Sequence, residues 1–500
     1  MPTRAARRAP GGRVVVVAAC SLVAVAVLSQ VQKVAPSTET FVSPASSWAL
    51  AGGRGSGAAL RGATARAAAG EADSEASDGS FWGTLRVMAS GLVLCAALLG
   101  PPRLSGSLEH PGLTAGPEPA LAGAYKGGSF ALGSKVNKDP LSLLQYALPL
   151  EDLLGGKEKV QSIRALQADI EYVKSNVPVR LWDKASQGSN DAAKAVADPT
   201  SRKDILALVS ADRKPQVEAI LDKLQKDEIP KLVRGIEKGA SVSMGTVKDE
   251  EAFVSLGEDT KACQELIGQI EDLMIPAGYT TTVPAEFSNL PRLSGRADIE
   301  VTLKRPEGST EKKYQKDEAT FPEAVFTIRV DGWSSPVTAG NFVDLVDKGF
   351  YNKMTIQRSD GFIIQTGDSG AAQKNGYIPP GETKVRKVPL EVGYIGRKDP
   401  LYSETVDEAG LVGRPVRIPF AVDGTIAQAR VEFDNDSGSS QVFMFLFESD
   451  MTPAGKNLLD GRYGSFGYTV GGNVFLRQIK EGDIILSMKV TNGLDRLVRP

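Results

Sequence analysis

The stretch "IQRSDGFIIQTGD", Ile356 to Asp368, decides how the C-terminal part of this chain is interpreted. It places Arg358 directly before a short polar turn, and the turn leads into an apolar run that contains one glutamine, Gln365. A lone arginine at the start of a strand is usually a surface charge whose stem lies on apolar neighbours. The alternative is that a site needs a permanent cation beside an apolar pocket. The sequence around the stretch decides between these two interpretations.

The segments that flank this stretch have the composition of short β-strands. They are rich in β-branched and aromatic residues and are separated by Gly, Pro and Asp turns: "DIEVTLKR", "AVFTIRVDG", "FIIQTGD", "VFMFLF" and "DIILSMKV". One helix is expected in "SPVTAGNFVDLVDKGFY", with Thr338 as its cap and with Phe342, Leu345 and Val346 on one face. Several short strands with few helices predict a closed β-barrel, because closure removes exposed strand edges.

The part of the chain that precedes these strands has a helical pattern. Asp139-Pro140 is a typical helix start, since proline is favoured in the first turn. Apolar residues then recur at three- and four-residue steps in three stretches: 160–177, 217–224 and 263–274. Such stripes predict a bundle in which the helices bury their apolar faces against one another. The stripes carry no visible chemistry, so we expect a structural bundle or a docking surface for a partner or for the neighbouring domain.

The first 122 residues have the features of a targeting leader that is largely disordered. Basic residues precede an apolar run from Val14 to Leu28, which is short for a membrane span and suits a signal-peptide core. A stretch rich in Ala, Gly, Ser and Arg follows, as in transit peptides, and then a second apolar run from Val87 to Gly100. An A-x-A cleavage signal ends at Ala122. This order predicts import into a plastid and then into the thylakoid lumen; a membrane anchor at one apolar run is the alternative.

The domain plan is therefore multidomain α and β, with residues 1–122 as the leader, 123–285 as an α-helical bundle and 286–500 as the β-rich domain. The chain has 58 Lys and Arg against 60 Asp and Glu, which disfavours a nucleic-acid-binding protein. Two of the three cysteines and the single histidine, His110, fall in the leader. Disulfides, cysteine-zinc sites and imidazole catalysis are thereby excluded, so we expect neither a metal nor a cofactor. Membrane contact is expected only through the leader or through membrane-bound clients.

Four blocks in a fixed order carry a more specific signal: "PVTAGNFVDLVDKGFYN", "IQRSDGFIIQTGD", "SGSSQVFMFLF" and "LLDGRYGSFG". Together they resemble the cyclophilin-type peptidyl-prolyl isomerases over roughly residues 295 to 495. The resemblance implies a C-terminal cyclophilin-like closed β-barrel. The complete architecture, with a leader and a helical domain before the barrel, resembles the thylakoid-lumen cyclophilins associated with photosystem II assembly.

The resemblance also implies a site for proline-containing peptides. An X–Pro bond turns slowly because amide resonance creates a barrier of ~18–20 kcal/mol, so catalysis needs no nucleophile. A guanidinium near the prolyl nitrogen stabilises the lone pair that appears only in the twisted state. By resemblance the catalytic residue is Arg358, and the substrate-binding residues are Phe362, Ile363, Gln365, Ala429, Gln441, Phe443, Leu458, Leu459 and Tyr463.

Some positions depart from the family pattern. Tyr463 and Leu458 replace a histidine and a tryptophan, and the turn from Arg358 to Phe362 is one residue short. A misplacement of an ångström can cost about a hundredfold in rate. We therefore expect a folding helper of the thylakoid lumen with attenuated isomerase activity, which assists photosystem II assembly or maintenance and acts on its proline-containing subunits. The alternatives are a non-catalytic peptide-binding assembly scaffold and a regulatory subunit whose bundle docks a membrane partner. The bundle is expected to pack on the barrel and to limit access to its groove.

Overall fold

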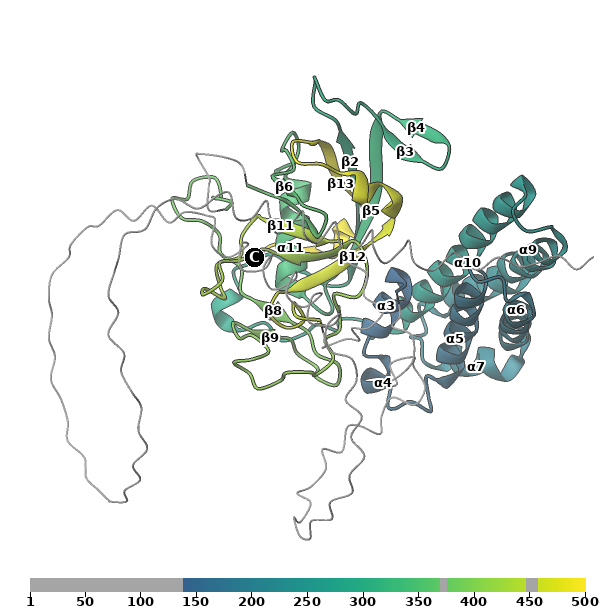
Figure 1. Ribbon diagram of the computed structural model, residues 1–500. Helices are drawn as coiled ribbons and strands as arrows, with labels where there is room; N and C mark the ends of the chain where they lie inside the picture. Colours follow the sequence, from purple (N-terminus) through teal and green to yellow (C-terminus); the bar gives the residue numbers. More distant parts are fainter. Residues whose placement is uncertain (1–137, 369–375, 447–456) are drawn as a thin grey trace, which may run out of the picture. The chain divides into compact units, whose positions relative to one another are not determined.

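The computed structural model describes residues 138–368, 376–446 and 457–500 (Figure 1). Helices occupy the first part of this range and strands the second, as predicted. The predicted leader, residues 1–122, lies outside the described residues. Within the described ranges, no helix combines the length and the apolar character that a membrane crossing requires.

The helical part contains a set of helices connected by short turns. They are α3 (Pro140–Ala147), α4 (Leu150–Leu153), α5 (Gln161–Asn176), α6 (Trp182–Ala197), α7 (Pro199–Ala207), α8 (Lys214–Lys223), the π-helical turn η1 (Leu224–Glu228), α9 (Ile229–Ser241) and α10 (Val247–Met274). Helix α3 begins as predicted, because the Asp139 carboxylate accepts a hydrogen bond of 3.0 Å from the Ser142 amide. The three predicted stripes lie in α5, in α8 with η1, and in α10.

Helix α6 was not predicted, and its packing explains why. Its buried face is formed mainly by the small residues Ala185, Gly188, Ser189 and Ala192, with Val196 as the one larger apolar residue. A Cβ atom at Gly188 would lie 2.9 Å from the Asp169 carbonyl oxygen of α5. The two helices therefore approach closely through small side chains, so few large apolar residues mark α6 in the sequence.

The strands form a curled, antiparallel, eight-stranded sheet with three two-stranded ribbons beside it. The sheet strands are β2 (Arg296–Lys304), β5 (Glu323–Asp331), β6 (Arg358–Ser359), β7 (Ile363–Thr366), β10 (Thr425–Gln428), β11 (Val442–Phe445), β12 (Ser465–Gly471) and β13 (Ile484–Asn492), in the spatial order β13-β2-β5-β12-β10-β11-β7-β6. The ribbons pair β1 (Arg292–Leu293) with β14 (Leu497–Val498), β3 (Tyr314–Lys316) with β4 (Ala319–Phe321), and β8 (Glu391–Val392) with β9 (Leu401–Tyr402). The short 3-10 helices are η2 (Ala285–Phe287), η3 (Asn473–Gln478) and η4 (Leu494–Arg496).

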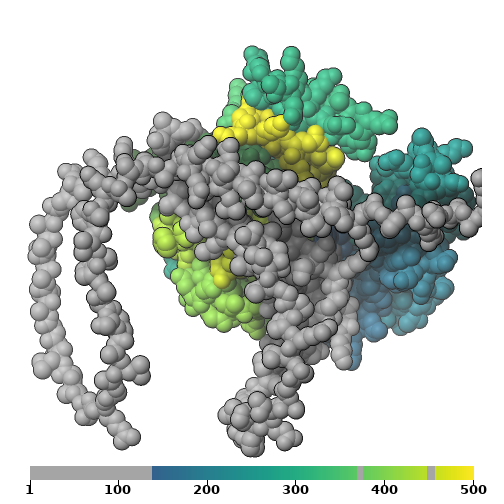
Figure 2. Space-filling view, in the orientation of Figure 1, coloured from purple at the N-terminus to yellow at the C-terminus, as the bar shows by residue number. Residues whose placement is uncertain are grey.

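The two edges of the sheet meet, which gives the expected barrel-like closure. Just before β6, the Lys353 amide donates to the Ile485 carbonyl (2.7 Å) and the Ile356 amide to the Asp483 carbonyl (2.8 Å), at the start of β13. Figure 2 shows the yellow surface of the C-terminal strands beside the green surface around β2, in agreement with the pairing of β13 and β2. Strands β10 and β12 were not predicted, because small and polar residues interrupt their apolar residues.

Helix α11 (Pro336–Asp347) fills one end of the barrel core. There the ring centroids of Phe342 and Phe466 are 5.4 Å apart. The prediction that Thr338 caps this helix is wrong, since the helix already begins at Pro336. The cap comes instead from Glu391, whose carboxylate accepts hydrogen bonds from the Val337 amide (3.2 Å) and the Thr338 amide (2.8 Å). Glu391 is distant from this helix in the sequence, so no local motif indicates that it caps the helix.

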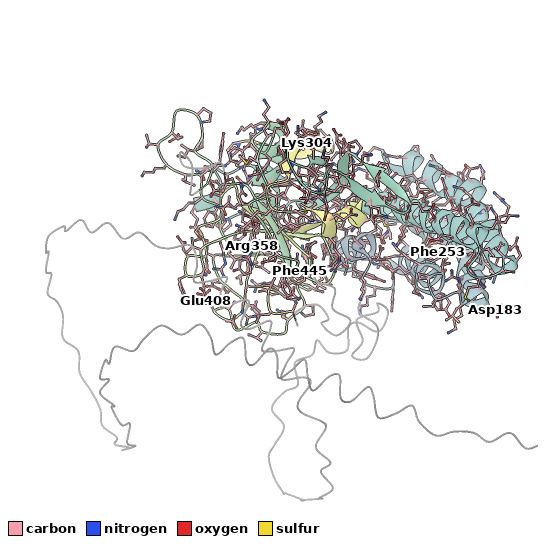
Figure 3. All side chains as sticks on the ribbon, turned by 45° about the horizontal axis from the view of Figure 1, so that its top comes forward. Asp183, Phe253, Lys304, Arg358, Glu408 and Phe445 are labelled. Atoms are coloured by element: carbon pink, nitrogen blue, oxygen red, sulfur yellow. The ribbon has the colours of Figure 1, made fainter. Side chains whose placement is uncertain are left out.

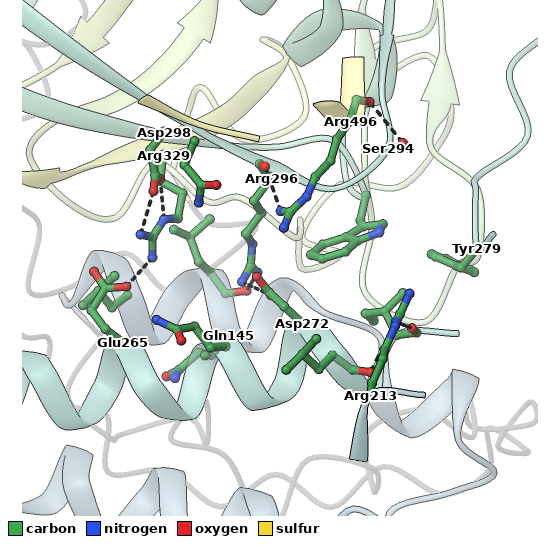
Figure 4. A pocket seen from close by; sticks show the side chains of 18 of the residues that line it. Gln145, Arg213, Glu265, Asp272, Tyr279, Ser294, Arg296, Asp298, Arg329 and Arg496 are labelled. Atoms are coloured by element: carbon green, nitrogen blue, oxygen red, sulfur yellow. Dashed lines mark hydrogen bonds and ion pairs between the residues drawn. The ribbon is translucent and has the colours of Figure 1, made fainter. Parts of the chain in front are cut away.

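Helix α10 contacts the sheet through two arginines of β2 and β5 (Figure 4). Arg329 binds Glu265 of α10 at 2.6 Å, and Arg296 binds Asp272 of α10 at 2.8 Å. A pocket of about 600 Å³ lies between these contacts. The bundle therefore packs on the barrel, as expected, and these contacts lie on β2 and β5. That the bundle limits access to the groove stays a prediction.

Candidate active site

A row of paired residues crosses four neighbouring strands at one edge of the sheet. Arg358 of β6 is opposite Gln365 of β7, Gln365 is opposite Phe443 of β11, and Phe443 is opposite Ala427 of β10. Residues paired in this way project from the same face of a sheet. The strand register therefore places the arginine, the glutamine and the aromatic ring side by side. Figure 3 locates Arg358 and Phe445 in the β-rich part of the chain.

The alternation of the strands separates this face from the barrel core. Ile364, Ile426 and Met444 belong to the large core cluster inside the barrel. Their neighbours along the strands belong to a second apolar cluster on the other face, formed by Ile363, Phe420, Ala427, Phe443, Phe445, Leu459 and Tyr463, with Ala429 packed against it. The structure thus brings together five of the predicted pocket residues: Ile363, Ala429, Phe443, Leu459 and Tyr463.

Three aromatic rings close the centre of this second cluster. The Phe443 ring lies parallel to Phe420 at a centroid distance of 6.1 Å, and the Tyr463 ring meets it edge-on at 5.5 Å. As a result Phe443 is only 1% exposed. Phe362 and Leu458, also predicted for the pocket, are 46% and 45% exposed, so they lie at the surface and not in the buried cluster.

Tyr463 is held in place by Arg430. The guanidinium lies 5.1 Å from the centre of the Tyr463 ring, and its Nε donates a 3.0 Å hydrogen bond to the Arg462 carbonyl. Burial raises the pKa of Tyr463 to about 12, so the phenol stays neutral. A neutral ring clamped in this way narrows the space beside Phe443.

The polar side of the site is a network around Gln441. The Gln365 amide nitrogen donates to the Gln441 side-chain oxygen at 2.9 Å. The Gln441 carbonyl oxygen accepts from the Ala429 amide at 3.0 Å and from the Gln428 side chain at 2.6 Å. All three predicted polar or backbone contacts, Gln365, Gln441 and Ala429, therefore adjoin one another. Such a network gives a peptide backbone fixed donors and acceptors beside the apolar cluster.

Arg358 is held by a carboxylate two residues further along the chain. Its Nε donates to Asp360 Oδ2 at 2.8 Å, and a second hydrogen bond joins its terminal nitrogen to the same oxygen. Burial raises the pKa of Asp360, but hydrogen bonds from Arg358 and from the Phe362 and Ile363 amides outweigh burial and hold this pKa below its usual value. Asp360 therefore stays ionised beside the arginine.

Other residues of this site were not predicted from the sequence: Asp360, Phe420, Ala427, Gln428 and Phe445. The Asp360-Gly361 pair is a turn signal, and a turn aspartate that can reach back to Arg358 was available from the sequence. Phe420 lies in an irregular segment without periodicity, so nothing local marked it. In the part of the chain that the structure describes, no group of three or more His, Cys, Asp or Glu residues is arranged to hold a metal ion.

Comparisons with known proteins match the two parts of the chain to two families. Residues 319–495 match the family described as cyclophilin type peptidyl-prolyl cis-trans isomerase/CLD, and residues 139–275 match the CYP38-like, PsbQ-like domain of peptidyl-prolyl cis-trans isomerases. The chain is 38% identical to the chloroplastic peptidyl-prolyl cis-trans isomerase CYP38 of Arabidopsis thaliana, over 73% of this chain and 76% of that protein.

Two further relatives have the same kind of name. A Synechocystis protein named as a candidate thylakoid lumen peptidyl-prolyl cis-trans isomerase, sll0408, is 35% identical over 74% of this chain and 86% of its own length. The chloroplastic CYP37 of Arabidopsis thaliana is 30% identical over 66% of this chain and 59% of its own length. The chain therefore belongs to the cyclophilin-type peptidyl-prolyl cis-trans isomerases, in the group that carries a CYP38-like, PsbQ-like helical domain.

Proposed function

We propose that this isomerase acts on X–Pro bonds of lumenal proteins with Arg358 as its catalytic residue. The observation that carries the assignment is the in-register row of Arg358, Gln365 and Phe443 on one face of the sheet. The row sets a permanent cation at the edge of the apolar cluster that we assign to the proline ring. Arginine suits this role because it is charged at every relevant pH and needs no tuning by its surroundings.

The roles of the other site residues follow from their positions. Phe443, Ile363 and Leu459 form the apolar wall for the proline ring, and the exposed Phe362 and Leu458 contact the peptide at the rim. Gln365, Gln441 and Ala429 supply hydrogen bonds that align the peptide backbone. Since the guanidinium interacts with the nitrogen lone pair only when the amide is twisted, it lowers the barrier without tightening ground-state binding.

We expect the rate to be attenuated, for two reasons visible at the site. Phe443 is covered by Phe420 and Tyr463, so a proline ring can reach it only if Tyr463 moves aside. Arg358 is in an ion pair with Asp360, so its charge is partly compensated before a substrate binds. Each feature reduces the share of molecules that are ready for catalysis.

The same covered Phe443 favours a second candidate, a peptide-binding assembly scaffold that does not turn over. A peptide that lies across the rim residues and the Gln441 network would bind without placing a proline on Phe443. Both candidates concern proline-containing clients, and in both we propose photosystem II subunits as clients during assembly or maintenance. The names of the relatives as chloroplastic or lumenal proteins support a lumenal location.

The domain plan and the route into the lumen belong to this proposal. We propose that residues 1–122 are removed as a two-part leader, that 123–285 form the helical domain and that 286–500 form the isomerase domain. The contacts of Arg296 and Arg329 with α10 support a helical domain that stays attached to the barrel.

An isomerisation assay on a proline-containing peptide separates the two candidates. The full chain and residues 286–500 alone are compared, together with a measurement of peptide affinity for each. Acceleration over the uncatalysed reaction, which takes tens to hundreds of seconds, supports the isomerase. Peptide binding without any acceleration by either form supports the scaffold.

A further inference from the structure

The turn that joins β6 to β7 is closed by one carboxylate. Asp360 Oδ1 accepts hydrogen bonds from the Phe362 amide (3.0 Å) and the Ile363 amide (3.1 Å). The Asp360 amide in turn donates to the Ile363 carbonyl at 3.3 Å. Gly361 permits this tight turn because its φ of +85° is in the left-handed region that other residues avoid. Asp360 is therefore fixed by the backbone on both sides.

The second oxygen of the same carboxylate faces Arg358. It accepts hydrogen bonds from Nε, at 2.8 Å, and from one terminal nitrogen of the guanidinium. The side chains of Arg358 and Asp360 are only 21% and 9% exposed, so water screens their attraction incompletely. Hydrogen bonds between two charged partners are also among the strongest in proteins. The short turn thus presents the arginine together with its own counter-ion.

We propose that Asp360 is a built-in counter-ion that lowers the isomerisation rate supported by Arg358. This inference rests on the catalytic role of Arg358 given above. The guanidinium acts through its positive charge and its N–H groups at the prolyl nitrogen of the twisted bond. A carboxylate in direct contact offsets much of this charge. It also accepts hydrogen bonds from the guanidinium N–H groups before and after the reaction. The guanidinium therefore stabilises the prolyl nitrogen of the twisted bond less than an uncompensated guanidinium would, and this loss in the transition state lowers the rate.

The opposite role is that Asp360 orients Arg358 for catalysis, in which case its removal slows the reaction. The two roles predict changes of opposite sign. Asp360→Asn separates them, because the asparagine oxygen still accepts from the Phe362 and Ile363 amides while the negative charge is lost. Asp360→Ser is a second variant, since a serine hydroxyl also closes turns, although more weakly.

The experiment measures kcat/KM for a proline-containing peptide, the affinity for the same peptide and the melting temperature, all on the full chain. We expect Asp360→Asn to raise kcat/KM about tenfold, equivalent to about 1.4 kcal/mol of transition-state stabilisation, with affinity unchanged. Asp360→Ser should change kcat/KM in the same direction. Asp222→Asn is the matched control: it removes a carboxylate that pairs with Arg202 at 2.5 Å in the helical domain, and it should leave kcat/KM unchanged.

A second pair of variants tests whether the effect passes through Arg358. In an Arg358→Ala background, Asp360→Asn should not alter kcat/KM, because there is no longer a guanidinium whose charge Asp360 could offset. A rise that persists in this background overturns the inference, and so does an unchanged or lower kcat/KM in both folded Asp360 variants. If Arg358→Ala alone isomerises as fast as the wild type, the catalytic assignment of Arg358 fails. If Arg358→Ala is slower but Asp360→Asn is not faster, only the counter-ion role fails.

Discussion

The buried Glu271 should make the free energy of unfolding of the helical domain depend on pH. This residue of α10 is completely buried, and its Oε1 accepts a 2.9 Å hydrogen bond from Arg164, which also binds Glu151. Burial raises the pKa of Glu271 to about 7, because the loss of hydration outweighs the attraction of Arg164 and Arg296. The ordinary value, which applies in the unfolded chain, is 4.5.

The direction of the effect follows from the raised pKa. The folded state holds the proton more tightly than the unfolded state, so this stabilisation is complete below about pH 4.5 and is lost as the pH rises through about 7. Each pKa unit corresponds to about 1.4 kcal/mol, so between pH 8 and pH 5.5 the wild type should gain on the order of 2 kcal/mol from Glu271. Glu271→Gln should lose this gain, because the glutamine does not titrate.

Urea unfolding followed by far-UV circular dichroism measures this difference, since the signal reports mainly the helices. The wild type and Glu271→Gln are compared at pH 5.5 and pH 8. Asp169, whose pKa is raised to about 6 mainly by burial, titrates in the same window but is present in both proteins, so the difference isolates Glu271. Glu258→Gln on the exposed side of α10 is the matched control and should keep the wild-type pH dependence. Equal pH dependence of the unfolding free energy in the wild type and in Glu271→Gln would show that Glu271 does not have a raised pKa in the folded chain.

Three other predictions test the pocket, the contact between the domains and the leader. Phe443→Ala should lower the free energy of unfolding by about 3–5 kcal/mol and weaken peptide binding, as checked by urea unfolding and titration calorimetry; unchanged affinity would remove Phe443 from the pocket. Arg296→Met should cost about 3–5 kcal/mol in the same unfolding assay, because it leaves the buried Asp331 carboxylate and the partly buried Asp272 carboxylate without their cation; a neutral effect would show that these contacts are dispensable. N-terminal sequencing of the protein from isolated plastids should find a start near Gly123, and a chain that retains residues 14–28 would contradict the lumenal route.

Most parts of the fold that the sequence predicted are rich in large apolar or β-branched residues. Strands β2, β5, β7, β11 and β13 contain the expected segments, and α5, α8 and α10 contain the expected stripes. Elements with small or polar residues at their buried positions were not predicted: β10 contains a threonine and a glutamine, and α6 packs through Gly188 and its small neighbours. Helix α9 was also not predicted, although its buried residues Ile229, Leu232 and Ile236 follow a helical period.

In the site, most of the predicted residues lie in the ordered blocks of sequence, whereas a residue placed by long-range packing was not predicted. Arg358, Gln365 and Phe443 were predicted from the ordered blocks of sequence, and the structure places them in one row. Phe420 was not predicted, because its stacking on Phe443 depends on an irregular segment that returns to the barrel. The ion pair of Arg358 with Asp360 is local, but only coordinates show that the carboxylate turns back onto the guanidinium.

We propose that Arg358 acts on the twisted X–Pro bond, and the kinetics of Arg358 variants test this role. Isomerisation kinetics and peptide affinity are measured for the wild type, Arg358→Ala and Arg358→Lys in the full chain. We expect a lower kcat/KM for Arg358→Ala with nearly unchanged affinity, and little rescue by lysine, whose compact ammonium lacks the planar guanidinium group. Equal isomerisation by the wild type and Arg358→Ala, with the peptide bound by both, would contradict the claim and leave the site as a peptide-binding surface.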